Sequence, residues 1–404
     1  MASSKKKILF VNESLACAGG EKSLLSILSS LDYDKYDVDL QLFKYGNPWD
    51  KLVDPHVKIL PPLPYAQFTG MPLLKAILYA LRHRKLSWLK SRLAYSAALR
   101  KNKEAGNVTK SILYWKKQSK CFDNIAGKYD YVIGYAQGIP TFYVADKADP
   151  LSKKLAWVNA TYLPPSPDKE YIEQKFSKIN IINFVTEELA GIERKHWPSI
   201  ENKSTAFPDL INPELITKMS KEEIDIKKDN SKTTIVTLGR LTLQKGYDMC
   251  IEAAKVLKDN NLNFIWYILG EGPYRVEMEQ AIQNFGLNDN VKLLGVKTNP
   301  YPYLRLADIY VQASRREGFG LAIAEARLLN IPVVATRFNT VFNQMINRKN
   351  GIVVDMTGPS IAAAIMELCE DKDLYNSILA YLQTESKGNI EMVPQFYEIL
   401  SSIS

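Results

Sequence analysis

Short apolar runs alternate with longer amphipathic stretches along the first part of the chain. KKILFV (6–11) is typical of a buried strand, EKSLLSILSSL (21–31) spaces its apolar residues as a helix does, and VDLQLF (38–43) has a strand pattern again. A strand, a loop, a helix and a second strand in this order predict a parallel, doubly wound sheet. Further strands of this part are expected at residues 131–135, 154–158 and 180–185.

The same alternation resumes after a polar, lysine-rich stretch at residues 212–232. Strands are expected at 233–238, 264–269, 291–294, 309–313, 332–335 and 352–354, with helices that include 246–258 and 274–285. A chain of 404 residues is also too long for one core of ordinary size. We therefore predict an α/β protein with two Rossmann-like doubly wound domains, residues 1–211 and 212–385, followed by a tail, residues 386–404.

Composition narrows the class of protein. A hydrophobic content of 46% and a charged content of 24% are those of a globular protein. No apolar run reaches the ~18 residues that span a bilayer, and the first seven residues lack the apolar core of a signal peptide. Three scattered histidines make a protein-built metal site unexpected, and four isolated cysteines favour a reducing cytoplasm. The cysteines are Cys17, Cys121, Cys250 and Cys369.

Positive charge is concentrated in residues 71–120. This segment has 13 Lys and Arg and one acid, Glu104, so it carries +12 in a chain whose net charge is +8. Leucines and aromatic residues are interspersed with the cations, a pattern that favours a helix lying on anionic lipid with its aromatics at the interface. The alternatives are nucleic-acid binding, which we do not expect, and a helix pair that packs its leucines on the domain. The aromatic residues are Tyr79, Trp88, Tyr95, Tyr114 and Trp115.

Two loops that follow predicted strands of the second domain carry candidate ligand-binding residues. Ligands of open α/β sheets bind at the carboxyl ends of the strands. In VTLGRLTLQKGYD (236–248), Arg240 and Lys245 can together hold a pyrophosphate, although two solvated surface cations would give the same pattern. In ILGEGPY (268–274), Gly270 and Gly272 let the backbone approach a ligand, or form an ordinary turn.

The stretch SRREGFGLAIAEA (314–326) is the most informative. Gly318, Phe319 and Gly320 precede a helix, whose N-terminal amides favour anions. Glu317 comes just before this terminus, and Glu325 lies about two turns further on, in an apolar stretch where a carboxylate needs a partner. A carboxylate accepts hydrogen bonds from two hydroxyls, which suits a vicinal diol. The alternative is a Glu317 that is favoured only by the helix dipole and an exposed Glu325. Arg315 and Arg316 receive no role.

The order of these motifs resembles that of retaining glycosyltransferases of family 4, which have the GT-B fold. The order is Gly-Gly near the N-terminus, Gly-Arg-x4-Lys-Gly, Gly-Glu-Gly-Pro, Glu-Gly-Phe-Gly-x4-Glu-Ala and then NIPVVAT (330–336). The match is densest over 233–355 and looser in the first half, through CAGGEKSLLSIL and KKLAWVN. The sequence is most similar to enzymes of capsular and exopolysaccharide assembly. GT-B implies two Rossmann-like domains that face a central cleft.

The resemblance implies a role for each residue. Arg240, Lys245 and Glu317 would form the catalytic set, in which the two cations stabilise the leaving diphosphate without a metal ion. Glu325 would hold the ribose, and Glu317 and the amides after it would line the sugar and phosphate. The donor-binding residues would be Gly19, Gly20, Asn159, Gly239, Gly270, Gly272, Gly318, Phe319, Gly320 and Glu325.

Two positions depart from the family pattern. Asn159 stands where members commonly have His, and FNTVFNQ (338–344) stands where many have Gly-Gly and a glutamate. An asparagine still hydrogen-bonds a sugar hydroxyl but does not titrate. Both departures bear on the donor sugar more than on the fold.

The function that the resemblance implies is transfer of a hexosyl group, with retention, from a UDP- or GDP-sugar to a lipid-linked or oligosaccharide acceptor. Residues 1–211 would bind the acceptor, residues 212–385 the donor, and the tail would cross back to the first domain. No cofactor is expected, and the enzyme would lie on the cytoplasmic face of the membrane. The alternatives are a non-catalytic sugar-nucleotide-binding or scaffold partner, favoured only by Asn159, and a glycan phosphorylase, for which no pyridoxal-phosphate lysine is marked.

Overall fold

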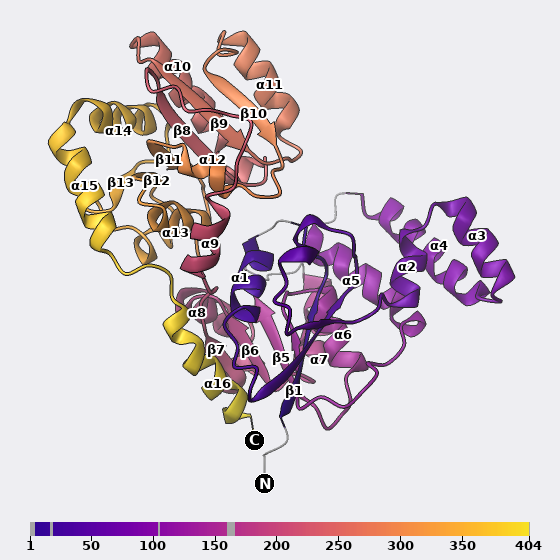
Figure 1. The fold of residues 1–404 in the computed structure, drawn as a ribbon. Coiled ribbons are helices and arrows are strands. Elements are labelled where there is room, and N and C mark those ends of the chain that lie inside the picture. The colour runs from indigo at the N-terminus through magenta and orange to yellow at the C-terminus, as the bar shows by residue number, and fades with distance from the viewer. Residues whose placement is uncertain (1–4, 17–18, 104–105, 160–165, 404) are drawn as a thin grey trace. The chain divides into compact units, whose positions relative to one another are not determined.

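The computed structural model describes residues 5–16, 19–103, 106–159 and 166–403. It divides into two compact units. The first comprises Met1–Asp209 together with Glu391–Ser404, and the second comprises Leu210–Ile390. Each unit contains one parallel sheet with helices on both faces (Figure 1).

The first unit has a seven-stranded sheet in the order β3-β2-β1-β4-β5-β6-β7, and every neighbouring pair is parallel. Its central strands are buried, as expected for a sheet that is covered on both faces. The strands are β1 (Lys6–Asn12), β2 (Tyr36–Leu42), β3 (Lys58–Ile59), β4 (Tyr131–Gly134), β5 (Lys153–Val158), β6 (Ile181–Phe184) and β7 (Ser204–Ala206). Strands β2 and β3 are added on one side of β1, and β4 to β7 on the other side. Sheets of this kind bind ligands at the point between β1 and β4, where the direction of addition changes.

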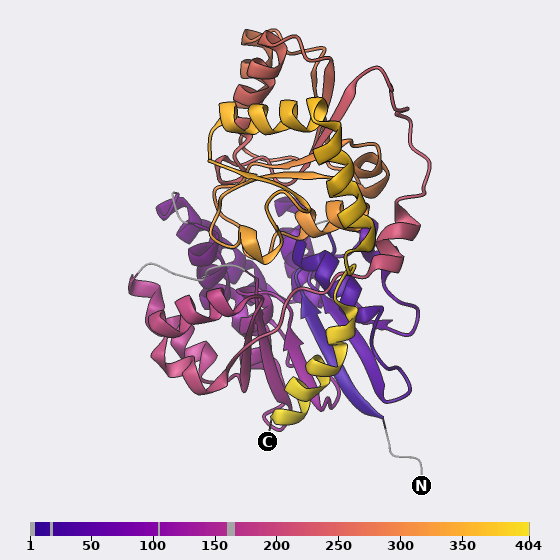
Figure 2. The ribbon, with the colours of Figure 1, turned by 90° about the vertical axis from the view of Figure 1, so that its left-hand side faces the viewer.

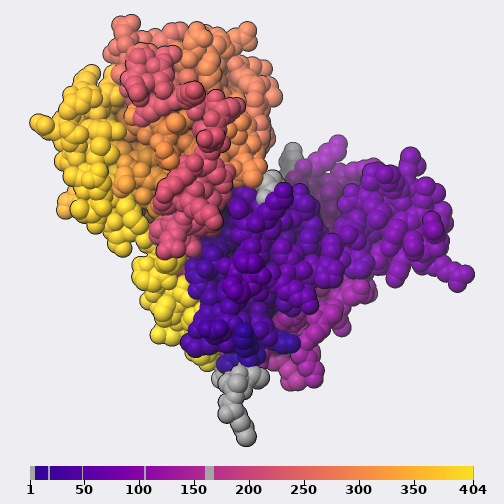
Figure 3. All heavy atoms as spheres, viewed as in Figure 1, coloured from indigo at the N-terminus to yellow at the C-terminus, as the bar shows by residue number. Residues whose placement is uncertain are grey.

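Helices of the first unit form two sets. Those that cover the sheet are α1 (Gly19–Leu28), α6 (Ile139–Lys147), α7 (Ser166–Phe176), α8 (Glu187–His196) and α16 (Val393–Ser402). Those inserted between β3 and β4 are α2 (Pro64–Gly70), α3 (Leu73–Arg82), α4 (Leu86–Lys101) and α5 (Asn107–Gln118). Helices α3 and α4 stand out from the rest of this unit (Figure 3).

Helix α16 belongs to the core of the first unit although it follows the second unit in sequence (Figure 2). Phe396 is fully buried and lies against the rings of Phe10 and Trp157, with centroids 6.4 and 6.3 Å away. The ring of Tyr397 stacks on Tyr36 of β2, with centroids 5.1 Å apart. The C-terminal residues therefore complete the apolar layer beneath β1 and β5.

The second unit has a six-stranded parallel sheet in the order β10-β9-β8-β11-β12-β13. Its strands are β8 (Thr233–Leu238), β9 (Phe264–Leu269), β10 (Val291–Gly295), β11 (Ile309–Gln312), β12 (Val333–Thr336) and β13 (Gly351–Val354). Its helices are α9 (Pro213–Met219), α10 (Tyr247–Asp259), α11 (Arg275–Asn284), α12 (Tyr301–Arg305), α13 (Leu321–Leu328), α14 (Gly358–Glu370) and α15 (Lys372–Thr384).

Both units are thus doubly wound α/β structures, and this part of the sequence prediction is confirmed. The short edge strands β3 and β7 were not predicted, because two or three residues carry too little hydrophobic pattern. Among the described residues, no helix has both the length and the apolar character that crossing a bilayer requires.

The packing of α16 predicts that Phe396→Ala destabilises the first unit. Removing a fully buried phenylalanine leaves a cavity and costs about 3 kcal/mol of unfolding free energy. Circular dichroism during thermal unfolding should show the first unit melting several degrees lower, whereas Gln395→Ala, at an exposed position of the same helix, should leave the curve unchanged. Equal melting of the two variants would contradict this account of α16.

Candidate functional site

Three of the sequence motifs meet at one edge of the sheet in the second unit. Strands β9, β8 and β11 are neighbours and run parallel, so their carboxyl ends lie side by side. The loops at residues 239–246, 270–272 and 313–320 leave these ends. Residues that are far apart in sequence are therefore brought to one place.

Glycines allow these loops to pack backbone against backbone. Gly246 has φ +71°, and a Cβ added there would lie 1.9 Å from the carbonyl oxygen of Ala313. A Cβ on Gly270 would lie 1.8 Å from the carbonyl oxygen of Gly239, and Gly272 is packed on the same loop in the same way. Such distances exclude any side chain at Gly246, Gly270 and Gly272, so these three glycines shape the edge of the sheet whatever they bind.

Lys245 and Glu317 form an ion pair at the centre of this edge. The Lys245 Nζ lies 2.6 and 2.8 Å from the two carboxylate oxygens, and the side chains are 26% and 11% exposed. Gln312 Nε2 and Ser314 Oγ also donate to Glu317 Oε1, at 2.7 and 2.5 Å. The sequence predicted both Lys245 and Glu317 as site residues, but not that they bind each other.

Groups that attract anions lie on the same two loops as this ion pair. Arg240 is exposed on the loop that also carries Lys245. Gly320, with φ +81°, caps α13, and Gly318 and Phe319 lie half-buried just before it. The unpaired amides at a helix N-terminus attract anions, as do exposed guanidinium groups. We call the loop at residues 239–246 the cationic loop and the loop at residues 313–320 the glycine loop. Both leave the same edge of the sheet in this unit.

Glu325 is buried in α13 and is only 1% exposed. The hydroxyl of Tyr301 donates to its Oε1 at 3.0 Å, and burial together with the charge of Glu325 raises the pKa of Tyr301. Glu325 therefore has the kind of partner that its apolar surroundings require. Tyr301 was missed from the sequence, because it lies in the short helix α12, outside every recognised motif.

Arg315 has a structural role that the sequence did not reveal. Its guanidinium forks onto the carboxylate of Asp248 in α10, with Nη1–Oδ1 and Nη2–Oδ2 distances of 2.8 and 2.5 Å. Although burial opposes ionisation of Asp248, this hydrogen bonding and the charge of Arg315 lower its pKa. Arg315 thus joins the loop after β11 to the start of α10. Arg316 is exposed.

The predicted residues of the first unit lie at the carboxyl edge of its sheet. Gly19 opens α1 and is exposed. Gly20 follows it next to the Asn159 side chain, since a Cβ on Gly20 would lie 3.3 Å from Asn159 Nδ2. The Asn159 backbone N–H donates to Gln137 Oε1 at 3.1 Å, and Nδ2 donates to Asp209 Oδ1 at 3.2 Å.

Asp209 is a buried acid that sequence reasoning missed. Its side chain is 4% exposed, and burial raises its pKa to about 6, while hydrogen bonds from Ser23 and Asn159 act in the opposite direction. Ser23 also shares a 2.8 Å hydrogen bond with the Tyr135 hydroxyl. The residue lies in FPDL (207–210), where neither spacing nor a motif distinguishes it from a loop aspartate.

Comparisons with known proteins agree with this arrangement. The family model of the glycosyl transferases group 1 matches residues 219–383, the segment that contains the cationic loop and the glycine loop. The chain also matches HepE of Anabaena, solved in complex with UDP and glucose, with a TM-score of 0.68 and 17% identity over 98% of this chain and 100% of that one. TarM of S. aureus gives a TM-score of 0.66 at 15% identity, with coverages of 98% and 99%.

Curated relatives match shorter segments. An uncharacterized glycosyltransferase of Methanocaldococcus jannaschii is 28% identical over 47% of this chain and 49% of its own length. The amylovoran biosynthesis glycosyltransferase AmsK of Erwinia amylovora is 29% identical over 42% of this chain and 45% of its own. The chain thus spans about half the length of these relatives.

The fold is GT-B, with two Rossmann-like α/β domains, as the sequence predicted. Residues 219–383 match the family model of the glycosyl transferases group 1.

The Lys245–Glu317 pair predicts energetic coupling between the two side chains. A cycle of Lys245→Met, Glu317→Gln and the double variant should give a coupling on the order of 1 kcal/mol in unfolding free energy, because the pair is partly buried. Urea denaturation measures it. The exposed pair Lys255–Asp259, changed to Met and Asn, serves as a control and should couple by less than about 0.5 kcal/mol. Equal coupling in both cycles would refute the special status of the site pair.

Proposed function

We propose that the protein is a glycosyltransferase that transfers a hexosyl group from a nucleoside-diphosphate sugar to a glycan acceptor. The observation that carries this proposal is the cationic loop with Arg240 and Lys245, which lies beside the amides that begin α13. A diphosphate is the kind of group that such a site binds. Structures of HepE with UDP and with UDP-glucose, which have the same fold, support a nucleotide-sugar donor.

The two cations act on the bond that breaks. As the sugar leaves, negative charge develops on the terminal phosphate, and preorganised positive groups stabilise this charge more than that of the bound donor. Arg240 is exposed, so its guanidinium is available to phosphate oxygens. Lys245 is held in place by Glu317 before any ligand arrives, which lowers the cost of orienting it. We propose that these side chains supply the charge that a metal ion supplies in other transferases.

We further propose that the reaction proceeds with retention and without a carboxylate nucleophile. Lys245, Gln312 and Ser314 donate four hydrogen bonds to the Glu317 carboxylate. These donors occupy its oxygens, so the carboxylate has little capacity left to attack the sugar. Glu317 then positions Lys245 and contacts the sugar, while a leaving phosphate oxygen takes the proton of the acceptor hydroxyl. Buried Glu325 is proposed to bind the ribose.

The acceptor is proposed to be a lipid-linked or oligosaccharide glycan of a cell-surface polysaccharide. The names of relatives support this class, since they include the amylovoran glycosyltransferase AmsK and the lipopolysaccharide core glycosyltransferase LpsD of Rhizobium meliloti. The rival proposal is a non-catalytic partner that binds a sugar nucleotide. Both proposals predict nucleotide binding, and only the first predicts turnover.

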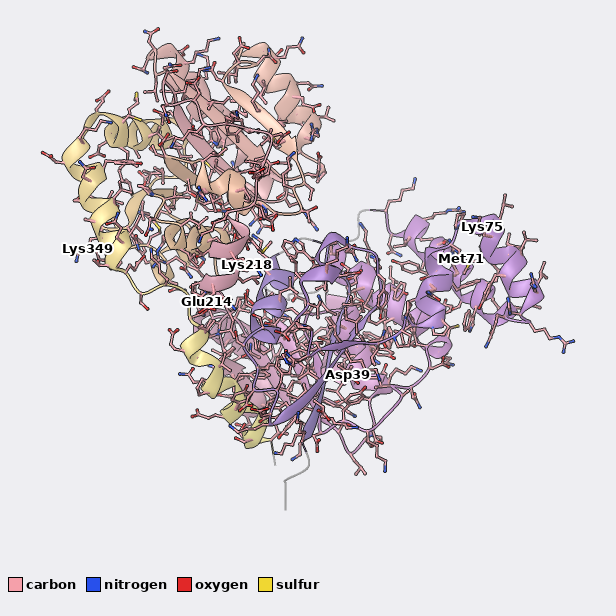
Figure 4. The ribbon with its side chains drawn as sticks, viewed as in Figure 1. Asp39, Met71, Lys75, Glu214, Lys218 and Lys349 are labelled. Atoms are coloured by element: carbon pink, nitrogen blue, oxygen red, sulfur yellow. The ribbon has the colours of Figure 1, made fainter. Side chains whose placement is uncertain are left out.

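Nucleotide release from a panel of UDP- and GDP-sugars, with a glycan-lipid extract as the acceptor, tests the proposal. We expect release with one donor, unchanged by EDTA, and an α-linked product from an α-linked donor. Arg240→Ala and Lys245→Ala should each lower kcat about 100-fold, because each removes charge at the leaving group. Lys349→Ala, at an exposed position of the same unit (Figure 4), is the charge-matched control and should retain full activity. Nucleotide binding without release from any donor would favour the non-catalytic partner.

A second proposal concerns the helical insert of the first unit. Helix α3 packs Ala76 and Ala80 inward, whereas Leu74, Leu78 and Leu81 are 77, 67 and 60% exposed. These leucines are spaced by four and three residues and therefore share one face of the helix. An amphipathic helix that buries alanine and exposes leucine has its larger apolar face unpaired.

Cations border this leucine face, which we name the α3 ridge (Leu74, Leu78 and Leu81). Lys75 lies on the same helix, in the part of the unit that stands out (Figure 4), and Arg82, Arg84 and Lys85 follow it. All four are exposed, and residues 71–103 contain no acid. An apolar stripe beside positive charge fits an anionic bilayer surface.

The aromatic residues do not take the place that the sequence indicated. Trp115 is fully buried and Trp88 is 7% exposed, so neither indole lies on the surface of the insert. Trp88 packs against Tyr65, with ring centroids 5.2 Å apart. The prediction that the aromatics lie at a membrane interface is therefore wrong for both tryptophans, and the exposed apolar surface consists of leucine.

We expect the protein to float with vesicles of phosphatidylglycerol and phosphatidylcholine at low salt, and not with phosphatidylcholine alone. Leu74→Gln/Leu78→Gln should abolish flotation without changing the net charge, because each leucine contributes burial of its apolar surface. Leu151→Gln, at a 91% exposed leucine of the same unit, is the control. Flotation that survives loss of the α3 ridge, or binding to nucleic acid in place of vesicles, would overturn the proposal.

A further inference from the structure

Asp209 occupies a distinctive place in the first unit. It follows β7, is 4% exposed, and its carboxyl lies among side chains from three other parts of the fold. Asn159 comes from the end of β5, Ser23 from α1, and Tyr135 from the residue after β4. This carboxyl lies at the edge of the sheet where the predicted ligand-binding residues gather. Its burial costs desolvation free energy, which an aspartate on the surface does not lose.

The carboxyl determines which way the Asn159 amide faces. An ionised carboxylate only accepts hydrogen bonds, so the amide must turn its NH2 group toward Asp209, as the 3.2 Å contact from Nδ2 shows. The amide is planar, and its carbonyl oxygen is consequently directed away from Asp209. The Asn159 backbone N–H is held by Gln137, and Gly20 leaves room beside the amide. Asn159 is half-buried and keeps access to a ligand.

We propose that Asp209 is a positioning residue that fixes the Asn159 carbonyl as a hydrogen-bond acceptor for a hydroxyl group of the transferred sugar. This inference rests on the proposed function. Asp209 would give Asn159 a preference for accepting a hydrogen bond from the ligand. An asparagine alone has no such preference, since a free amide can rotate and offer either its NH2 group or its carbonyl. With Asp209 ionised, only the orientation with the NH2 group toward Asp209 adds a hydrogen bond to the one from Ser23, whereas the other would set the amide carbonyl oxygen against the carboxylate.

The charge on Asp209 is therefore the element that selects the orientation. Tyr135 is the titratable side chain that faces it from the end of β4, and burial keeps the hydroxyl of Tyr135 neutral by raising its pKa. Ser23 faces it from α1, where Glu21 and Lys22 precede Ser23. A neutral Asp209 can donate a hydrogen bond to the Asn159 carbonyl oxygen, so protonation permits the opposite orientation.

Side-chain amide NMR tests the contact without any ligand. In the ¹⁵N spectrum, the Asn159 NH2 signals, assigned from their loss in Asn159→Ala, should shift with one titration between pH 5 and 7. The shift should vanish in Asp209→Asn. It should persist in the control Asp39→Asn. Asp39 lies on β2 of the same unit and accepts a hydrogen bond from the Tyr129 hydroxyl (Figure 4). An Asn159 signal that titrates equally in Asp209→Asn would overturn the inference whether or not the protein is an enzyme.

Monodeoxy donor analogues test the selection. With wild-type enzyme, a donor that lacks the hydroxyl bonded to the Asn159 carbonyl should have a kcat/KM about 10-fold or more below that of the complete donor. In Asn159→Ala the two donors should have nearly equal kcat/KM. Asp209→Asn should reduce the discrimination several-fold and abolish its pH dependence between pH 5 and 7, whereas Asp39→Asn should change neither. Full discrimination in Asp209→Asn would refute the positioning role, whereas a wild-type enzyme that turns over no donor would refute the proposed function.

Discussion

The ion pair between Lys245 and Glu317 is the contact on which the candidate site depends. It joins the loop after β8 to the loop after β11, which lie 72 residues apart in sequence. Glu317 receives further hydrogen bonds from Gln312 and Ser314, so its position is fixed from its own strand, β11. A flexible lysine is thereby held at the edge of the sheet by a carboxylate that has little freedom of its own. Orientation achieved before binding is what makes such a cation effective at a transition state.

The pair can form only because the backbones of the two loops approach closely. Gly246 lies against the carbonyl of Ala313, and any side chain there would push the loops apart. Arg315 strengthens the same connection through Asp248 at the start of α10. Gly246 and Arg315 thus set the distance between the two loops that carry Lys245 and Glu317.

The sequence predicted the two sheets well, because buried parallel strands such as β8 and β9 are short apolar runs that stand out from their surroundings. It also predicted which loops leave the carboxyl ends of the strands in the second unit, because parallel strands end at the same edge of their sheet. It could not predict partners. Lys245 and Glu317 meet through the register between β8 and β11, and the burial of Trp88 and Trp115 depends on which helix faces the core. An amphipathic pattern identifies a face but does not say whether protein or solvent covers it.

Three carboxyl groups of the two units have different properties because their surroundings differ. Glu317 is surrounded by donors, including a lysine, and is suited to holding a cation. Glu325 is buried in α13, where it accepts a hydrogen bond from the Tyr301 hydroxyl. Asp209 is enclosed by Ser23, Asn159 and Tyr135, and burial raises its pKa to about 6. A lysine fixes the first carboxylate, an apolar helix encloses the second, and burial brings the titration of the third toward neutral pH. The proposed link between Asp209 and Asn159 would therefore give the first unit a hydrogen-bonding group that responds to pH.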